Sequence, residues 1–453
     1  MLNIVGKRWI LRSRCISPLA TWYQSEGSTA SRLFSSTCRK NGSGMFGGFA
    51  RSNLGLEHGL VRPVLASIRQ LPEVDAAVSD QSPSTLTIDG LKRASEVFAS
   101  FDKGGREHLA VQALLAECQQ RLGLYDDAIG SIEELQHSLH GSESETAHNF
   151  KEDTILALAK VYWMRGDFEK SQALCEAIIS TYDDLTETFP STKLHMASAM
   201  TGKALSQLAA MKTMDDAYSV RDFFGVAIKF LERHPPSENT LPQAVALSNA
   251  GVAEVIYNLY LQDTNDVSVP MTPALKYLFQ GLQKTKVNQS TSSKKIVAAS
   301  HALEASIQAN LAWGVINYEE DRSDRVKKAS EYAKKALAFY DAEGIVGKEG
   351  LSWILSVVAS CYHQAGNAVT AEGLLQSAIS KKDMPIDTLS RLQLRDAYRE
   401  YSKLCMEWDK REKDAENHIK DADDVESSLP SNWQGKSSGI HGSLWFWTPG
   451  DFL

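Results

Sequence analysis

Three segments of the chain share one spacing of small residues around a glycine. In each, an alanine is followed seven residues later by a glycine and twelve residues later by a second small residue. The three sets are Ala116, Gly123 and Ala128; Ala159, Gly166 and Ser171; and Ala359, Gly366 and Ala371. From Leu86 to Val425 apolar residues recur at three- and four-residue intervals, as on amphipathic helices, and no alternating run demands a strand. The pattern predicts an all-α protein built from pairs of helices.

This spacing resembles the tetratricopeptide repeat (TPR), in which two helices joined by a short turn cross closely at small residues. The resemblance places the first alanine of each set on the first helix, the glycine in the turn and the last small residue on the second helix. A glycine at such a turn can end a helix with a positive φ angle. The aromatic residues that accompany the three glycines are Tyr125, Tyr162, Phe168 and Tyr362.

The repeats are longer and less regular than the roughly 34 residues of a standard TPR. The second-helix small residue recurs at intervals of 43, 46, 57, 55 and 42 residues, at Ala128, Ser171, Ala217, Ala274, Ala329 and Ala371. Loops are expected at 239–242 and 263–273. We expect about six hairpins between residues 88 and 383, stacked as a right-handed superhelix in which neighbours bury each other's apolar stripes.

The last repeat of such a stack needs a helix with a polar outer face to cover it. No proline lies between Pro385 and Pro430, and apolar residues follow a helical stripe from Leu389 to Trp408 before thinning out. We therefore expect a repeat domain over 87–385 and one long capping helix over 386–429, with its far end in solvent. A coiled-coil helix that pairs with a partner is the alternative.

The N-terminal region has the composition of a targeting segment. Its first 56 residues contain eight basic residues and one acidic residue, Glu26, among many serines and threonines, which is typical of a mitochondrial transit peptide. The residues around Phe34 resemble a presequence cleavage site. We expect a transit peptide over 1–34, a linker with a short helix over 35–86, and a location in the matrix or on the matrix-facing inner membrane. A basic tail on a cytosolic protein and a plastid address are the alternatives.

The rest of the chain is acidic. Residues 57–453 carry 40 basic and 55 acidic side chains, a net charge of −15, against −8 for the whole chain. This excess argues against a nucleic-acid binder, whose binding face is basic. No apolar stretch is long and uninterrupted enough for a transmembrane helix. Protein partners are therefore favoured, with peripheral contact to a membrane left open.

Signatures of catalysis, cofactors and metals are weak. Residues 42–47 match the text of a dinucleotide-binding pattern, but no apolar strand precedes them. The loop at 344–348 lacks the first glycine of a phosphate-binding loop. His137, His140 and His148 lie in a polar stretch without convergent carboxylate or thiolate ligands. We predict a protein that is not an enzyme and has no cofactor or metal.

The remaining reactive groups fit structural roles. The acidic pair Asp126-Asp127 is expected to open a second helix, where negative charge suits the helix dipole. Four of the six cysteines follow the first 56 residues and lie far apart on apolar helical faces, without the spacing of a zinc site or a redox pair: Cys118, Cys175, Cys361 and Cys405.

The C-terminal tail, residues 430–453, is unusually aromatic. Three of the nine tryptophans fall in the last 21 residues, and an exposed cluster of this kind needs a cover. The tail either folds back into the groove of the repeats, inserts into a partner where Trp and Phe supply much of the binding energy, or touches a membrane surface. The candidate partner-binding residues are Trp433, Trp445, Phe446, Trp447 and Phe452.

Together these features predict a non-catalytic scaffold for protein–protein interaction, acting as an adaptor, an assembly factor or a peripheral subunit of a mitochondrial complex. Helical solenoids offer extended surfaces that suit the gripping of another chain. The alternative is a helical-repeat protein that binds organellar transcripts, which would need a basic groove or paired base-reading side chains in each repeat.

Overall fold

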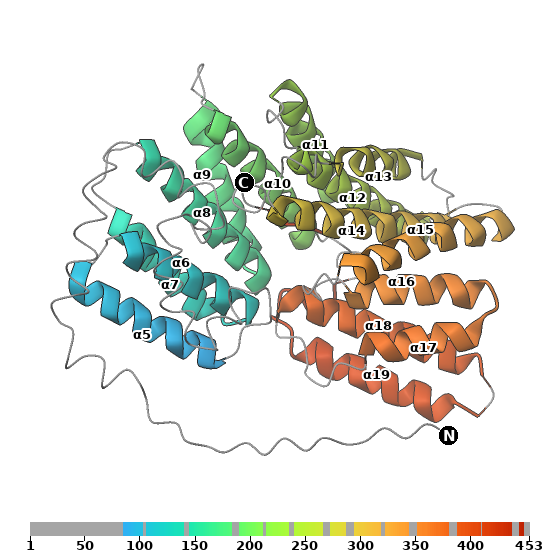
Figure 1. Cartoon of the computed structure of the whole chain (residues 1–453). Coiled ribbons are helices and arrows are strands. Elements are labelled where there is room, and N and C mark those ends of the chain that lie inside the picture. The colour runs from blue at the N-terminus through green and yellow to red at the C-terminus, as the bar shows by residue number, and fades with distance from the viewer. Residues whose placement is uncertain are drawn as a thin grey trace, which may run out of the picture. The chain divides into compact units, whose positions relative to one another are not determined.

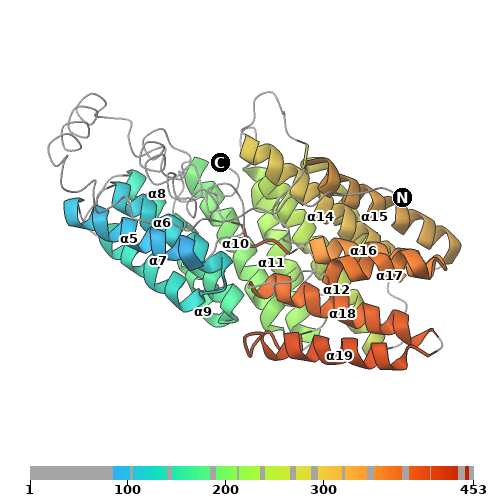
Figure 2. The ribbon, with the colours of Figure 1, turned by 60° about the horizontal axis from the view of Figure 1, so that its bottom comes forward.

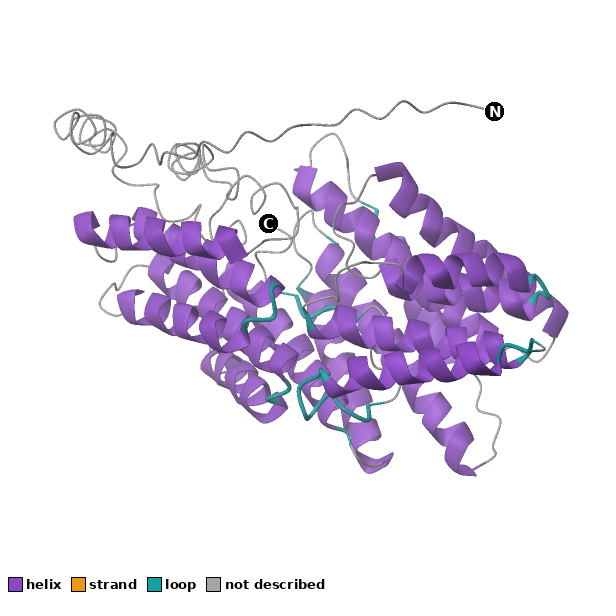
Figure 3. Ribbon diagram, turned by 90° about the horizontal axis from the view of Figure 1, so that it is seen from below, coloured by secondary structure: helices purple, strands orange, loops and turns teal. Residues whose placement is uncertain are grey.

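The structure of the chain is a computed structural model in which the described residues form fifteen helices and no strand (Figures 1 and 3). The described ranges are 85–102, 106–139, 145–183, 190–211, 214–234, 240–265, 272–286, 294–318, 322–343, 351–379, 387–408, 410–436 and 444–447. The expected transit peptide, residues 35–84 of the expected linker over 35–86, the glycines at 42–47 and the loop at 344–348 lie outside them. The all-α prediction is confirmed for the described part of the chain.

The helices follow one another with short connections. The first eight are α5 (Thr85–Asp102), α6 (Arg106–Arg121), α7 (Tyr125–Leu139), α8 (Glu145–Arg165), α9 (Phe168–Asp183), α10 (Pro190–Ala210), α11 (Met214–Arg233) and α12 (Leu241–Asn265). The other seven are α13 (Thr272–Lys284), α14 (Lys294–Tyr318), α15 (Arg322–Glu343), α16 (Leu351–Gln364), α17 (Ala368–Ile379), α18 (Thr388–Met406) and α19 (Glu412–Ser427).

Consecutive helices pack in pairs, and six of these pairs match the expected hairpins. They are α6/α7, α8/α9, α10/α11, α12/α13, α14/α15 and α16/α17. The small residues assigned to second helices all lie on the second helix of a pair, and those whose side chains are described have no exposed surface: Ala128, Ser171, Ala274, Ala329 and Ala371. The repeats therefore differ in the lengths of their helices and connections, whereas the second helix of each pair keeps its small residue.

Three turns repeat one local geometry. Gly123, Gly166 and Gly366 have φ angles of 69°, 93° and 79°, as expected for glycines that end a helix. In the first turn the N–H of Leu124 donates to the carbonyl of Gln119 at 2.9 Å, and equivalent bonds of 2.8 and 2.9 Å close the other two. Each glycine thus lets the chain reverse while it satisfies a helix-end carbonyl.

Apolar clusters join each hairpin to the next. Leu158 and Val161 of α8 pack with Ala128 of the preceding hairpin. Ala312 of α14 packs with Ile354 of α16 in a second cluster. The stack is therefore held together by apolar contacts between neighbouring hairpins, as in helical repeats.

Two expected boundaries are wrong in detail. Helix α12 begins at Leu241 and helix α13 at Thr272, so the prolines at 242 and 273 lie inside helices and not in the expected loops. Proline is accepted in a first helical turn because its missing N–H would have had no partner there.

The expected single capping helix over 386–429 is also wrong. The chain turns back after Met406, where Lys410 has a φ of 68°, and α19 then packs along α18 as a further hairpin (Figure 2). Ala415, Ala422 and Val425 are buried. The apolar stripe thins there because small residues let α19 lie close to α18. The low apolar content of this segment predicted exposure to solvent, whereas the segment contacts a helix.

The last hairpin also contacts the early part of the chain. The hydroxyl of Thr388, at the start of α18, donates to the carbonyl of Met164 in α8 at 2.8 Å and lies 2.9 Å from the hydroxyl of Tyr125. In a simple solenoid each repeat touches only its neighbours. Here α18 packs against α16 and α17 and also reaches α8.

Candidate functional site

The C-terminal tail binds to a surface made by the first helices of three successive hairpins, α8, α10 and α12. We call this surface the tail-binding face and define it by Trp163, Ser198, Gly202 and Asn249, which contact the tail. Helix α10 packs against both α8 and α12, so the three helices form one continuous surface. Two short parts of the tail, 430–436 and 444–447, lie on it.

Trp433 holds the first of these parts. Its side chain has no exposed surface, and its indole N–H is shared between the carbonyls of Trp163 and Met164, each at 3.1 Å. Its ring meets the rings of Trp163 and Phe168 edge-on, with centroids 5.3 and 4.9 Å apart. Asn432 donates to the carbonyl of Gly166 at 3.0 Å. The tail therefore adds donors at the end of α8, where the carbonyls of Trp163 and Met164 also accept bonds from Gly166 and Thr388.

Residues 444–447 are held mainly through their backbone. The side-chain amide of Asn249 donates to the carbonyl of Trp445 at 2.9 Å and accepts from the N–H of the same residue at 3.0 Å. The hydroxyl of Ser198 donates to the carbonyl of Trp447 at 2.6 Å. Bonds of this kind grip an extended chain whatever its side chains are.

One side chain in this segment fits a shaped position. Phe446 is 4% exposed, and its ring centroid lies 5.8 Å from that of Trp163. A Cβ atom on Gly202 would lie 2.6 Å from Cζ of Phe446 and 2.9 Å from Sγ of Cys175. Only glycine at 202 leaves room for the ring, so the tail-binding face combines backbone recognition with one aromatic position.

The structure places the candidate tail residues as follows. Trp433, Phe446 and Trp447 are buried against the chain's own helices, and Trp445 is half-buried. Phe452 lies outside the described residues. This arrangement agrees with the alternative in which the tail folds back, and binding of a partner by these side chains stays a prediction. Sequence reasoning missed Ser198, Gly202 and Asn249; a glycine and an asparagine inside long apolar helices were the available signals.

A buried ionic cluster lies between α8 and α10. Nε2 of His195 is 2.8 Å from Oδ1 of Asp153, and its Nδ1 is 3.6 Å from Oε2 of Glu152. All three side chains are almost wholly buried. Burial raises the pKa of Glu152 to about 7, against the lowering effect of His195. The cluster joins two first helices and was not predicted.

A pocket of about 320 Å³ lies between α14, α16 and α18, and we call it the α14–α18 pocket. Trp313 and Trp353 line one part of it, and another part is lined by Asp396 and Glu400 of α18 and by its C-cap residue Glu407. It uses the first helices of later hairpins, as the tail-binding face uses those of earlier ones.

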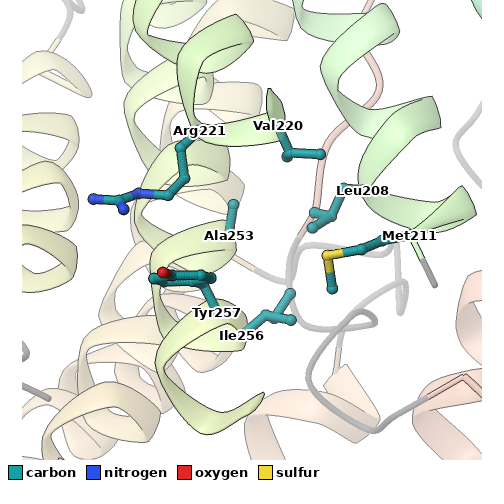
Figure 4. Close-up of a pocket in the computed structure, with 7 residues that line it drawn as sticks. All are labelled: Leu208, Met211, Val220, Arg221, Ala253, Ile256 and Tyr257. Atoms are coloured by element: carbon teal, nitrogen blue, oxygen red, sulfur yellow. The ribbon is translucent and has the colours of Figure 1, made fainter. Parts of the chain in front are cut away.

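A second hollow, between α10, α11 and α12, has no room for a water molecule. Figure 4 shows its lining residues, Leu208, Met211, Val220, Arg221, Ala253, Ile256 and Tyr257. The guanidinium of Arg221 lies over the ring of Tyr257 at 5.0 Å, and its Nε donates to Glu254 at 2.6 Å. These are packing contacts, and the hollow is no ligand site.

The other residues considered for chemistry have structural surroundings. The four cysteines are buried free thiols, and burial raises the pKa of Cys361 to about 12. Asp126 and Asp127 lie in the first turn of α7, as expected. His137 is exposed on α7, His140 is outside the described residues, and the side chain of His148 is not described. Within the described ranges no group of three His, Cys, Asp or Glu side chains is arranged to hold a metal.

Comparison with known proteins gives no family assignment, since no protein-family model matches the chain and no curated protein is significantly similar to it. Among the helices that the structure describes, none combines the length and the apolar character needed to cross a membrane.

Proposed function

We propose that this chain is a TPR-like scaffold for other proteins that works without catalysis, as an adaptor, an assembly factor or a peripheral subunit of a mitochondrial complex. One observation carries the proposal. The first helices of successive hairpins hold residues 444–447 of the chain's own tail through Asn249 and Ser198, which bind the backbone of that segment.

The supporting argument concerns what such a surface recognises. An asparagine amide that bonds both the N–H and the C=O of one residue reads the backbone of an extended chain and accepts many sequences. Stacked first helices repeat that opportunity along the array. In this chain the tail uses part of the surface, and the α14–α18 pocket continues the first-helix surface with no described segment over it.

The mitochondrial part of the proposal rests on the composition of residues 1–34. Import of the full chain into isolated mitochondria tests it, with a variant that begins at residue 35 as the matched comparison. Protease-protected full chain and unprotected truncated chain would support the presequence. Equal protection, or protection of neither, would overturn it.

The scaffold role is tested by isolating the tagged full chain from organelles and identifying what accompanies it. A matrix protein with the same tag serves as the control for background binding. Protein partners recovered in fixed proportion, and resistant to nuclease, would support the proposal. Transcripts retained at high salt would favour the RNA-binding alternative, and a chain recovered alone would overturn both.

A further inference from the structure

The α14–α18 pocket has two walls of different chemistry. One wall is aromatic and aliphatic: Trp313 of α14 and Trp353 of α16 meet edge-on with ring centroids 5.4 Å apart, and Val357 lies one helical turn beyond Trp353. The indole N–H of Trp353 has no hydrogen-bond partner among the described residues. At about 320 Å³ the pocket is at the small end of ligand sites, large enough for a single long side chain and its backbone.

The other wall is acidic. Asp396 and Glu400 of α18 and its C-cap residue Glu407 follow each other at helical spacing and therefore share one face. Glu400 accepts from Lys403 at 2.6 Å, and Glu407 lies 2.8 Å from Nε2 of His363. Asp396 is buried and accepts two bonds from Arg395, at 3.1 and 2.9 Å. Burial raises the pKa of Asp396 to about 7 and Arg395 occupies its carboxylate, so the wall offers a ligand the carboxylates of Glu400 and Glu407, beside Lys403.

We propose that the α14–α18 pocket binds the side chain of an arginine, or of a lysine, on an extended segment of a partner protein. This inference rests on the proposed function, because it assigns the chemistry of one partner contact. The aliphatic stem lies along Trp313, Trp353 and Val357, and the cationic head group reaches Glu400 and Glu407.

Charge and shape favour this occupant. A long basic side chain is apolar along its stem and cationic at its tip, as the two walls require. A cation near tryptophan faces gains a cation–π attraction, which adds to the attraction of the carboxylates. An arginine suits the site better than a lysine because its planar guanidinium stacks on aromatic rings and binds carboxylates through two bonds. An anionic side chain would be repelled by α18.

Lys403 already occupies Glu400, and an incoming guanidinium can readily replace it. The side chain of Lys403 is 68% exposed, so its ion pair with Glu400 is screened by solvent and weak. An incoming guanidinium replaces Lys403 at Glu400 and leaves no carboxylate without a counter-charge. Removal of the lysine should therefore strengthen binding, whereas removal of the carboxylates should weaken it.

The test uses the full chain labelled with 5-fluorotryptophan and probed with Nα-acetyl-arginine methylamide by fluorine NMR. Substitutions Trp313→Phe and Trp353→Phe assign the two resonances among the nine tryptophans. We expect saturable shifts of these two resonances, and at least about tenfold weaker binding of the matched norleucine and glutamate amides.

Variants then locate the site. The double variant Glu400→Gln/Glu407→Gln should weaken arginine binding about tenfold, because it removes the carboxylates that attract the guanidinium. Lys403→Ala should tighten binding, because it removes the cation that competes for Glu400. Asp424→Asn on the exposed part of α19 removes a carboxylate outside the pocket and should leave the affinity unchanged. Unshifted resonances of the other tryptophans show that each variant is folded.

The proposal is overturned if the arginine amide shifts neither resonance, if the norleucine amide binds equally well, or if Asp424→Asn weakens binding as much as the double variant. Recovery of protein partners from organelles is measured separately. Partners recovered without arginine binding would remove only this pocket assignment, whereas arginine binding by a chain that recovers no partner would count against the scaffold role.

Discussion

Replacing Gly202 by alanine tests whether the tail lies on the tail-binding face. Alanine in a helix interior normally stabilises a protein by about 1 kcal/mol relative to glycine. At Gly202 the added Cβ would meet Cζ of Phe446 at 2.6 Å and Sγ of Cys175 at 2.9 Å, both closer than real Cβ contacts allow. Overpacking of this kind costs about 1–3 kcal/mol, which exceeds the gain in propensity. The difference predicts that Gly202→Ala lowers the free energy of unfolding by up to about 2 kcal/mol.

The chain provides matched controls for the same substitution. Gly130 of α7 and Gly373 of α17 are helical glycines whose Cβ would have no neighbour within 4 Å. Alanine at either position should stabilise by about 0.5–1 kcal/mol. Thermal melts of the three variants, followed by circular dichroism at one protein concentration, should therefore place Gly202→Ala below the wild type and the two controls above it.

A double-mutant cycle separates the tail from the cysteine. Phe446→Leu shortens the side chain that the new methyl group would meet, so the cost of Gly202→Ala should fall by about 1 kcal/mol in that background. The reasoning is refuted if Gly202→Ala is as stabilising as Gly130→Ala, since the tail would then not approach α10. The reasoning is also refuted if the effects of Gly202→Ala and Phe446→Leu on the free energy of unfolding are additive, because the added methyl group would then not contact Phe446.

Three further measurements follow from the site. Asn249→Ala removes both hydrogen bonds to the backbone of Trp445 and should lower the free energy of unfolding by about 1–3 kcal/mol. Hydrogen exchange followed by mass spectrometry should show faster amide exchange over 444–447, and unchanged exchange would contradict the binding of this backbone by Asn249. The pKa of Glu152 is about 7 in the folded chain and 4.5 in the unfolded chain, so the folded state binds this proton more tightly and its stabilising contribution is lost as pH rises through 7. Urea unfolding from pH 4.5 to 8 should therefore show the free energy of unfolding of the wild type falling by about 1–3 kcal/mol relative to that of Glu152→Gln. Parallel pH curves for the two proteins would refute this linkage. The thiols of Cys175 and Cys361 should resist alkylation at pH 8 in the folded chain and react after unfolding, as read by site-resolved mass spectrometry; rapid native labelling would show that they are accessible.

Local sequence predicted the repeating unit because the unit is set by local geometry. The distance from Gly123 to Ala128 determines where two helices can cross, and the positive φ at the glycine follows from the turn itself. The same logic located the small residue of each second helix despite repeat lengths that vary. Periodicity could not say which way α19 would run, because a short apolar stripe is equally compatible with solvent and with a close helix partner.

The tail contacts could not be predicted from local patterns. Trp433 bonds to Trp163 across 270 residues, and Asn249 bonds to Trp445 across 196. Nothing near Asn249 in the sequence specifies that partner, although a buried asparagine in an apolar helix must have some partner. The aromatic tail indicated a need for burial, and its actual position depends on the fold of distant hairpins.

The tail-binding face and the α14–α18 pocket differ in the contacts that an incoming chain would have to replace. A chain that takes the tail's place must supply new backbone bonds for the buried amide of Asn249, and each buried polar group left without a partner costs about 1–3 kcal/mol. It must also fill the space of Phe446 beside Gly202. A chain that enters the α14–α18 pocket displaces only the exposed ion pair of Lys403, a contact worth about 1 kcal/mol or less. Under the proposed scaffold function, a partner would therefore engage the later hairpins more readily than the earlier ones, and exchange at the tail-binding face would require a segment that closely imitates the tail.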